Sequence, residues 1–309
     1  MNTNIDFKPA TTSKRTSSAK MMVLDPCHMV ANHMEVSDLP SQLSKGDVLV
    51  FNDAATIPAS FNLKSIWGQL EFRLISNLSV QMYDPTKWSA VIYLKGSWKA
   101  KTEEREIFNL VQSRSFRIDH DLVLDIRQVD EHYQIDFRGN ASRIWQFLYE
   151  KGAPIQYSYH QNNLMLWDIQ TIFASRPLAL EAPSAAFHID WQIINNAREK
   201  GVSVAFISHA AGVSATGVKS IDDQLPFDER YSIPKETADI IKKAKENGGR
   251  VIAVGTSATR ALEDSHLKHG YLKHGEGLAN TKLHRGFKLE VVDGLISGLH
   301  EAGSSHLKL

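Results

Sequence analysis

The chain has 309 residues, of which 42% are hydrophobic and 23% charged, a composition typical of a globular protein with a substantial core. Its 35 Lys and Arg residues balance 35 Asp and Glu residues, so there is no overall basic bias. A nucleic acid would therefore have to bind through a local concentration of positive charge, and non-specific wrapping of a long duplex is disfavoured. The single cysteine, Cys27, excludes an internal disulfide and a cysteine-rich zinc site, and it suits a reducing cytoplasm.

Residues 1–20 are rich in Thr, Ser and Lys, and we expect them to form a mobile arm. They lack the apolar region of a secretory signal peptide, and no apolar run reaches the ~20 residues that a membrane helix needs. We therefore expect a cytoplasmic protein that has no membrane partner.

A buried strand that ends in polar residues is predicted early in the chain. Gly46 and Asp47 form a turn, residues 48–51 read Val-Leu-Val-Phe, and Asn52 and Asp53 follow. The last two side chains are well placed to bind a ligand, although an Asx turn explains them equally well. A short strand over residues 21–25 and a polar connection over 37–45 are expected before this point.

Residues 61–152 show short runs with a period near two, separated by turn residues, which predicts antiparallel strands in a small β-barrel or sandwich. A short helix over residues 142–151 is expected to close this segment. Its aromatic side chains could stack on nucleic acid bases, but we favour the interpretation that they form the core. The predicted strands cover 71–75, 89–94, 115–118 and 132–138. The aromatic residues are Phe72, Trp88, Tyr93, Trp98, Phe116, Tyr133 and Phe137.

An alternation of helices and strands returns after residue 152. Asp190 is expected to cap a helix, residues 202–208 to form a buried strand, and Pro234 to open a second helix before the strand 251–254. Helix and strand units in succession predict parallel pairing through right-handed crossovers.

These patterns predict an α/β fold with a mixed or barrel-like α/β core. We expect this core to consist of residues 21–60 and 153–309, and residues 61–152 to be an inserted small antiparallel β-barrel domain.

The stretch RVIAVGTSATRALE, residues 250–263, places Gly255, Thr256 and Ser257 between a strand and a helix. First-turn N–H groups of a helix lack partners within the helix, so such a turn can hold an anion or a polar ligand. Taken locally, a turn and a helix cap explain these residues more often than a ligand does. We expect Arg260 and Glu263 to pair with each other on the helix or, with about equal weight, to contact substrate.

The chain beyond Glu263 is rich in His, Lys and Gly. His266 and His269 share a helix face, but no second paired motif accompanies them, so a solvated polar surface is expected and no metal site. Residues 286–296 are predicted to form a strand, a turn and a second strand.

Several segments, in this order, resemble the S-adenosylmethionine:tRNA ribosyltransferase-isomerase family of queuosine biosynthesis. The most specific of them is the Ala-Val-Gly-Thr-Ser-x-x-Arg-x-Leu-Glu run that ends at Glu263. The matching segments are residues 46–53 with 57–59, 182–188, 200–206, 250–263, and 291–296 with Leu299 and His300.

The resemblance implies an α/β core with an inserted β-barrel, a transferase and isomerase activity, and no metal. The ribosyl part of S-adenosylmethionine would be transferred to the aminomethyl-deazaguanine wobble base of tRNA and isomerised, giving epoxyqueuosine while adenine and methionine leave. tRNA and S-adenosylmethionine are the implied partners, and we expect a monomer or a weak homo-oligomer.

The reaction that the resemblance implies needs a base near the sulfonium and polar groups for the ribose. We assign Asp53 or His188 as the catalytic base or orienting group. The candidate S-adenosylmethionine-binding residues are Asn52, Gly255, Thr256, Ser257 and His300.

The chain departs from the family pattern at several positions. Two family arginines after the first strand are replaced, within Ala54-Ala55-Thr56 and at Ser60. A family histidine is absent or displaced at His209, and Phe227 replaces another, although Glu229 is retained. Because the family continues with a further helix, we expect a C-terminally shortened member. The alternative is a divergent homologue, non-catalytic or with another reaction, that binds a nucleoside or sulfonium ligand or RNA.

Overall fold

The computed structural model describes residues 18–25, 28–94, 105–109, 113–157, 163–284 and 286–298. The chain divides into two compact units. Within the described residues, the first unit contains 56–169 and 212–227, and the second contains 18–55, 170–211 and 228–298. Residues 1–17 of the expected arm, Trp98, Leu299 and His300 lie outside the described residues. Among the helices in these described parts, none has the length and apolar character that crossing a bilayer requires.

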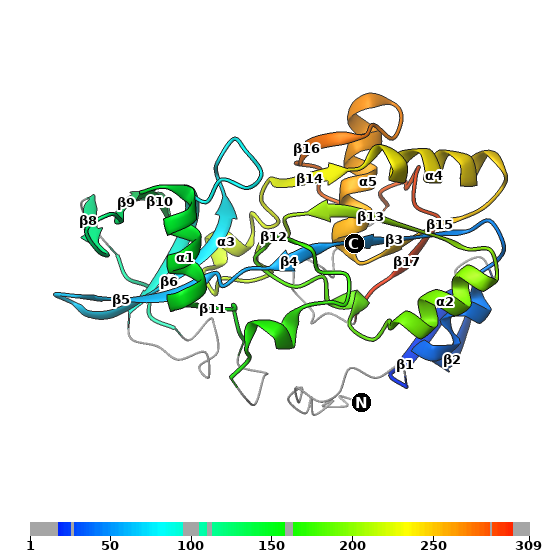
Figure 1. The fold of residues 1–309 in the computed structure, drawn as a ribbon, viewed down its shortest axis with the longest axis horizontal. Helices are drawn as coiled ribbons and strands as arrows, with labels where there is room; N and C mark the ends of the chain where they lie inside the picture. Colours follow the sequence, from blue (N-terminus) through cyan, green and yellow to red (C-terminus); the bar gives the residue numbers. More distant parts are fainter. Residues whose placement is uncertain are drawn as a thin grey trace. The chain divides into compact units, whose positions relative to one another are not determined.

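The second unit is built on a six-stranded sheet with the strand order β16-β14-β13-β3-β15-β17 (Figure 1). The central strand β3 pairs in parallel with β13 and β15, and β17 pairs in parallel with β15. β14 and β16 extend the sheet in the antiparallel sense. The predicted parallel pairing is confirmed. The strands are β3 (Val48–Asn52), β13 (Ser203–His209), β14 (Glu229–Ile233), β15 (Val251–Val254), β16 (Gly275–Ala279) and β17 (Gly294–Ile296).

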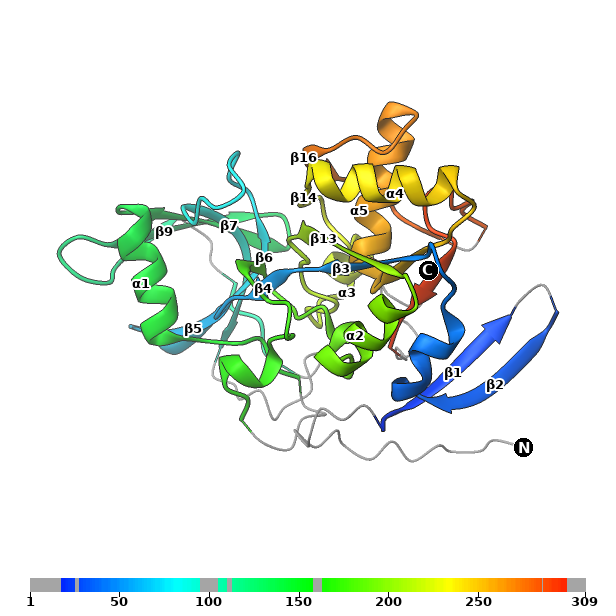
Figure 2. The same cartoon turned by 45° about the vertical axis from the view of Figure 1, so that its right-hand side comes forward.

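Helices cover both faces of this sheet, which explains why its central strands are continuous apolar runs. Val48 and Val50 of β3 belong to the core beneath α4 and α5, whereas Leu49 and Phe51 belong to the core beneath α2. Figures 1 and 2 show α4 and α5 on one side of the sheet and α2 on the other. The helices are α2 (Trp191–Glu199), α4 (Lys235–Glu246) and α5 (Thr256–His269), with 3₁₀ turns η1 (Val36–Gln42) and η4 (Ser184–Ala186).

The sequence signals for helix ends are confirmed. Asp190 accepts a hydrogen bond from the N–H of Ile193 at 2.9 Å and so caps α2. Pro234 directly precedes α4.

Gly270, which was not among the predicted signals, ends α5 in the left-handed conformation.

Two small two-stranded sheets complete the second unit. β1 (Lys20–Asp25) and β2 (Val30–Glu35) form a hairpin, visible in Figure 2, and the first of these strands is the one predicted over residues 21–25. β12 (Arg176–Ala179) pairs with β4 (Ala54–Thr56), which directly follows the end of β3. This pairing brings residue 176 close to the polar residues after β3.

The first unit contains a seven-stranded antiparallel sheet with the order β11-β5-β6-β7-β10-β9-β8. The predicted strands are present, together with β5, β9 and β11, which the sequence patterns did not single out. The strands are β5 (Ser60–Ser65), β6 (Gly68–Asn77), β7 (Lys87–Leu94), β8 (Arg114–Arg117), β9 (Val123–Val129), β10 (His132–Arg138) and β11 (Gly152–Ala153). The helical elements are α1 (Ala141–Lys151), α3 (Lys219–Asp222) and the 3₁₀ turn η3 (Leu166–Ile169).

The aromatic residues of the first unit form its core. Phe72, Trp88 and Tyr93 are at most 1% exposed, Tyr133 and Phe137 are also buried, and the rings of Phe72 and Phe116 pack edge to face. These described rings are therefore packing groups, and the base-stacking alternative is not supported for them. The chain as a whole is a mixed α/β protein, as predicted.

One predicted strand is wrong. Residues 286–292 are irregular, and only β17 forms in the predicted strand, turn and strand over 286–296. The carboxylate of Glu263 accepts hydrogen bonds from the N–H groups of Glu290, Val291 and Val292 at 2.8–3.0 Å. These amides are thus occupied by a side chain, which leaves them unavailable to a strand ladder.

Candidate functional site

Polar residues gather where β3, β13 and β15 end. Phe51 of β3 is in register with Phe206 of β13 and with Val254 of β15. Because the three strands are parallel, the residues that follow them emerge at one edge of the sheet. This edge carries Asn52, Asp53, Ser208, His209 and the turn at 255–257.

Asn52 ties the three strand ends together. Its Nδ2 donates to the carbonyl of His209 at 3.0 Å, and its Oδ1 accepts from the N–H groups of His209 and Ala54 at 2.9 and 3.0 Å. Nδ2 also lies 3.3 Å from Oγ of Ser257, at the start of α5. Asn52 is only 1% exposed, so these contacts use both ends of its amide and hold the edge together.

Asp53 lies beside Asn52 in a cluster of hydroxyl groups. Ser208 donates to Oδ1, and Ser175 donates to Oδ2 at 3.0 Å. Nε of Arg176 lies 3.8 Å from Oδ2. The carboxylate of Asp53 is 16% exposed and the side chain of Arg176 is 42% exposed, so an incoming ligand can reach this pair.

The turn after β15 has the geometry that the sequence predicts. Gly255 has a φ of +99°, a backbone conformation that residues with a side chain rarely adopt. Its N–H donates to the carbonyl of Ile296 at 2.8 Å. Thr256 and Ser257 open α5 and are half-buried. The first-turn N–H groups of this helix therefore begin at the polar edge.

The segment 183–188 approaches the same turn. A Cβ atom placed on Gly255 would lie 3.7 Å from Cβ of Ala185. His188 follows this segment, half-buried, just before the cap of α2. Asp53 contacts Ser175 and Arg176, at the start of β12, and Ser208 of β13.

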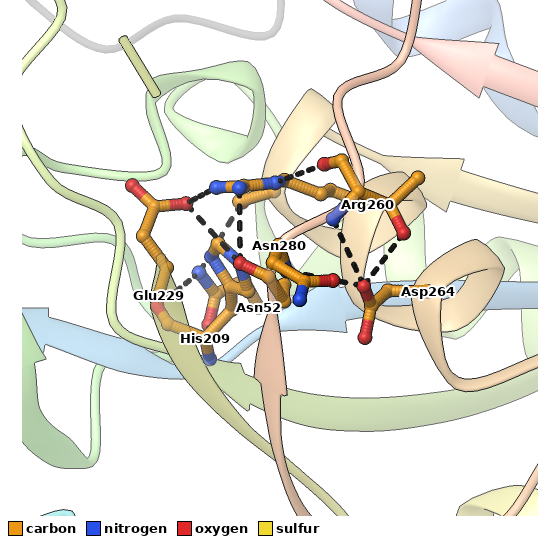
Figure 3. A network of polar contacts seen from close by, with 9 residues as sticks. Asn52, His209, Glu229, Arg260, Asp264 and Asn280 are labelled. Carbon is orange, nitrogen blue, oxygen red and sulfur yellow. Dashed lines mark hydrogen bonds and ion pairs between the residues drawn. The ribbon is translucent and has the colours of Figure 1, made fainter. Parts of the chain in front are cut away.

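A buried ionic network lies behind Asn52 and was not anticipated as a unit (Figure 3). Arg260 of α5 donates to the carboxylate of Glu229 on β14. Nε2 of His209 lies 3.4 Å from the same carboxylate, and its Nδ1 has no hydrogen-bond partner in the part of the chain that the structure describes. Each of the three side chains is at most 10% exposed.

Burial determines the charge state of His209. Removal of the ring from water lowers the pKa of His209 to about 4, despite the opposing effect of the Glu229 carboxylate. The ring is therefore neutral at pH 7, and Arg260 neutralises Glu229. The expected pair between Arg260 and Glu263 is wrong, because Glu263 caps the backbone of residues 290–292 instead.

Asp264 extends the network toward the end of α5. Its Oδ1 accepts from the N–H groups of Asn280 and Thr281 at 3.1 Å and from Oγ1 of Thr281 at 2.7 Å. Oδ2 lies 2.9 Å from Nζ of Lys268. Burial would raise the pKa of Asp264, but the hydrogen bonds from Thr281 and Lys268 outweigh that effect and lower it.

The structure thus brings Asn52, Asp53 and the 255–257 turn to one edge of the sheet. His188 is three residues after Ala185, which lies next to that turn. Sequence reasoning missed Ser175, Arg176 and Ser208, and only the pairing of distant strands reveals them. Within the described residues, no group of three His, Cys, Asp or Glu side chains is arranged to hold a metal ion.

Comparisons with known proteins identify the family of this chain. The sequence model described as "Queuosine biosynthesis protein" matches residues 3–309. The S-adenosylmethionine:tRNA ribosyltransferase-isomerase of Trichlorobacter lovleyi is 27% identical over 301 residues, which cover 96% of this chain and 84% of that protein. The protein of the same name from Clostridium kluyveri is 28% identical with the same coverage. That of Staphylococcus epidermidis is 28% identical over 292 residues, 93% of this chain and 82% of that protein.

A crystal structure of S-adenosylmethionine tRNA ribosyltransferase from Thermotoga maritima aligns with 94% of this chain and 80% of its own. The TM-score is 0.44 and the sequence identity 21%. The family resemblance predicted from the sequence motifs is confirmed by the match over nearly the whole chain. The chain belongs to the queuosine biosynthesis protein family.

Proposed function

We propose that this chain is an S-adenosylmethionine:tRNA ribosyltransferase-isomerase whose active site lies at the polar edge of the six-stranded sheet. The observation that carries the proposal is the junction of three strand ends through Asn52, which bonds to His209 and Ser257. Asn52 and Ser257 of this junction belong to segments that gave the family resemblance, and the family match covers residues 3–309. The names of the relatives describe the enzyme, so a non-catalytic homologue is not favoured.

S-adenosylmethionine is the ribosyl donor in this proposal. The N–H groups at the start of α5, with Thr256 and Ser257, hold ribose hydroxyls or the methionine carboxylate. Gly255 allows the ligand to approach the backbone closely, and His300 contributes from the C-terminal segment. The half-exposed guanidinium of Arg176 supplies positive charge next to this edge.

Asp53 is the general base that we favour, because Ser175 and Ser208 orient its carboxylate and leave it 16% exposed. It removes a proton near the sulfonium, which is acidified by the neighbouring positive sulfur. His188 is the alternative base or an orienting group. The ribosyl group is transferred to the aminomethyl nitrogen of the deazaguanine base, which loses a proton to solvent, and isomerises to the epoxy-cyclopentanediol. Adenine and methionine leave, and the product is the epoxyqueuosine base of tRNA.

The domain organisation predicted from the sequence forms part of the proposal. Residues 61–152 would be an inserted barrel-like domain, and residues 21–60 and 153–309 the α/β core. The seven-stranded antiparallel sheet and the six-stranded sheet support a division into two parts, although the compact units differ from these bounds, because residues 153–157, 163–169 and 212–227 group with the seven-stranded sheet. We further propose that the protein acts in the cytoplasm as a monomer or a weak homo-oligomer.

The decisive experiment measures adenine release from S-adenosylmethionine in the presence of tRNA that carries the aminomethyl-deazaguanine base. We expect release by the wild-type chain and a loss of release in Asp53→Asn, with the substrate still bound. Binding of S-adenosylmethionine without release by the wild type would overturn the enzyme proposal and favour an altered function. A fully active Asp53→Asn variant would remove Asp53 from the role of base and direct attention to His188.

A further inference from the structure

Trp191, the first residue of α2, is an aromatic side chain that the proposed function does not yet use. It is 51% exposed, although tryptophan is a residue type that is highly buried on average. Its neighbours on the same helix, Ile193 and Ile194, are at most 2% exposed and belong to the core beneath α2. The exposure therefore belongs to Trp191 itself and does not reflect a loosely packed helix.

The ring of Phe173 supports the ring of Trp191. Their centroids are 5.5 Å apart and their planes meet at 75°, which is an edge-to-face contact. Phe173 is only 7% exposed and packs in turn on Phe51 of β3, with the ring centroids 4.3 Å apart. We call Phe173 and Trp191 the aromatic wall. A perpendicular contact covers at most one face of the indole, so the wall fixes the ring and leaves a face for a ligand.

The aromatic wall lies at the polar edge of the six-stranded sheet. Phe51 lies two residues before Asp53. Phe173 lies two residues before Ser175, which donates to the carboxylate of Asp53 at 3.0 Å. The helix α2 leads into β13 and packs beside it in the opposite direction, so its first turn faces the carboxyl end of this sheet (Figure 1). Trp191 therefore lies on the side of the sheet where the ligand is proposed to bind.

A packed segment connects the aromatic wall with the turn after β15. A Cβ atom placed on Gly255 would lie 3.7 Å from Cβ of Ala185, and Trp191 follows six residues later. Ala186 and Ile189, which lie between them, are at most 2% exposed. The turn that is proposed to hold the ribose or the methionine carboxylate is thus joined to the wall by buried residues and not by a free loop.

We propose that the exposed face of Trp191 stacks on the adenine ring of S-adenosylmethionine. The inference rests on the proposed function and adds the subsite for the base of the ribosyl donor. Adenine is bonded directly to the ribose, whereas a methylene group separates the deazaguanine ring from its reacting nitrogen. Adenine is therefore the flat group that lies nearest to the ribose at this edge, and stacking on an indole contributes affinity without contact to the reacting atoms.

The test compares variants that separate an aromatic face from apolar bulk. Trp191→Leu keeps an apolar side chain over Phe173 but removes the aromatic face, and Trp191→Phe keeps both. Tyr271→Ala is the matched control, because Tyr271 is 59% exposed and follows the end of α5 that is distant from the 255–257 turn. Isothermal titration measures the affinities for S-adenosylmethionine and for S-adenosylhomocysteine, which keeps the adenine but lacks the positive sulfur. Circular dichroism verifies the fold of each variant.

Trp191→Leu should weaken the binding of both ligands by the same factor, about tenfold, while Trp191→Phe retains most of the affinity and Tyr271→Ala all of it. KM for S-adenosylmethionine should rise more than kcat for adenine release falls. The quench of tryptophan fluorescence on ligand binding should be smaller in Trp191→Phe than in the wild type. This last comparison tests stacking even if Trp191→Leu does not fold.

Three results would overturn the assignment to adenine. A loss confined to S-adenosylmethionine would identify a cation–π contact with the sulfonium. A rise in KM for tRNA alone would identify stacking on the wobble base, and unchanged affinities in a folded Trp191→Leu would show that Trp191 only covers Phe173. A wild-type chain that binds neither ligand and releases no adenine would instead count against the proposed function.

Discussion

Asn52 and His209 exchange two hydrogen bonds across neighbouring parallel strands, through the side-chain amide of one and the backbone of the other. The same amide reaches Ser257 at the start of α5. The candidate site is therefore supported by a side chain that is almost completely buried. The sequence suggested Asn52 as a ligand-binding residue, and that role stays a prediction. Its contacts are those of a residue that positions His209, Ala54 and Ser257.

Asn52→Ala should destabilise the protein by about 2–4 kcal/mol, because the N–H and carbonyl of His209 and the N–H of Ala54 lose buried partners. Urea unfolding measures this free energy. Asn62→Ala, at an exposed position of β5, is the matched control and should change it by less than about 0.5 kcal/mol. Equal stability of the two variants would show that the Asn52 contacts do not support the fold.

Asp53→Asn should reduce adenine release at least about a hundredfold while the unfolding free energy changes little. The amide oxygen can still accept from one of Ser175 and Ser208 and the amide NH2 can donate to the other hydroxyl, but the amide cannot take a proton. Ser208→Ala should give a smaller loss, since Ser175 continues to orient the carboxylate. The check is the ratio of kcat between the variants in the adenine assay. A larger loss in Ser208→Ala than in Asp53→Asn would contradict Asp53 as the base.

The acid sensitivity of the protein should depend on His209. The pKa of His209 is about 4 in the folded chain and 6.5 for a free side chain, so the unfolded state binds the extra proton between these values. The contribution of neutral His209 to the free energy of unfolding should be fully present above pH 6.5. It should fall by about 1.4 kcal/mol per pH unit as the pH drops toward 4.

Urea midpoints at pH 5, 6 and 7 measure this dependence, and His209→Gln provides the comparison because glutamine does not titrate. The contribution of His209 should be missing from the variant, whose midpoint should fall less between pH 7 and pH 5. Parallel curves for the two proteins would show that His209 is protonated in the folded state or exposed.

The strands around the site were predictable because their signals are local. Residues 251–254 are apolar on both faces of the strand, which is a local signal for a buried strand. Gly255 marks the end of this strand, because its positive φ is a conformation that glycine adopts more readily than other residues. The pair between Arg260 and Glu229 was not predictable, since its partners are 31 residues apart and meet only through the order of the strands. Likewise, β16 contains two glycines and has little strand propensity of its own, so it forms because β14 offers it an edge.

Gly277 of β16 should tolerate no side chain. A Cβ atom there would lie 2.3 Å from Cζ and 2.4 Å from the hydroxyl of Tyr231, whose ring is 3% exposed and cannot move away freely. Gly277→Ala should therefore destabilise the protein by about 1–3 kcal/mol through overpacking. Gly298→Ala is the control, because no atom lies within 4 Å of the added Cβ. Thermal unfolding of both variants measures the difference, and equal melting temperatures would contradict the close packing of Tyr231 on β16.

Thr256→Val should abolish S-adenosylmethionine binding and leave the fold intact. Valine has nearly the shape of threonine but lacks the hydroxyl, and residue 256 is half-buried at the first turn of α5, where the ligand is proposed to lie. A ligand hydroxyl or carboxylate that loses this partner in a shielded site loses much of its affinity. Isothermal titration with S-adenosylmethionine measures the loss, and circular dichroism verifies the fold.

Thr256→Ser keeps the hydroxyl and should restore most of the affinity, which separates a lost hydrogen bond from a change of shape. If Thr256→Val bound S-adenosylmethionine as tightly as the wild type, the turn after β15 would be a structural cap only. The ligand would then have to be held mainly by groups around Asp53 and Arg176.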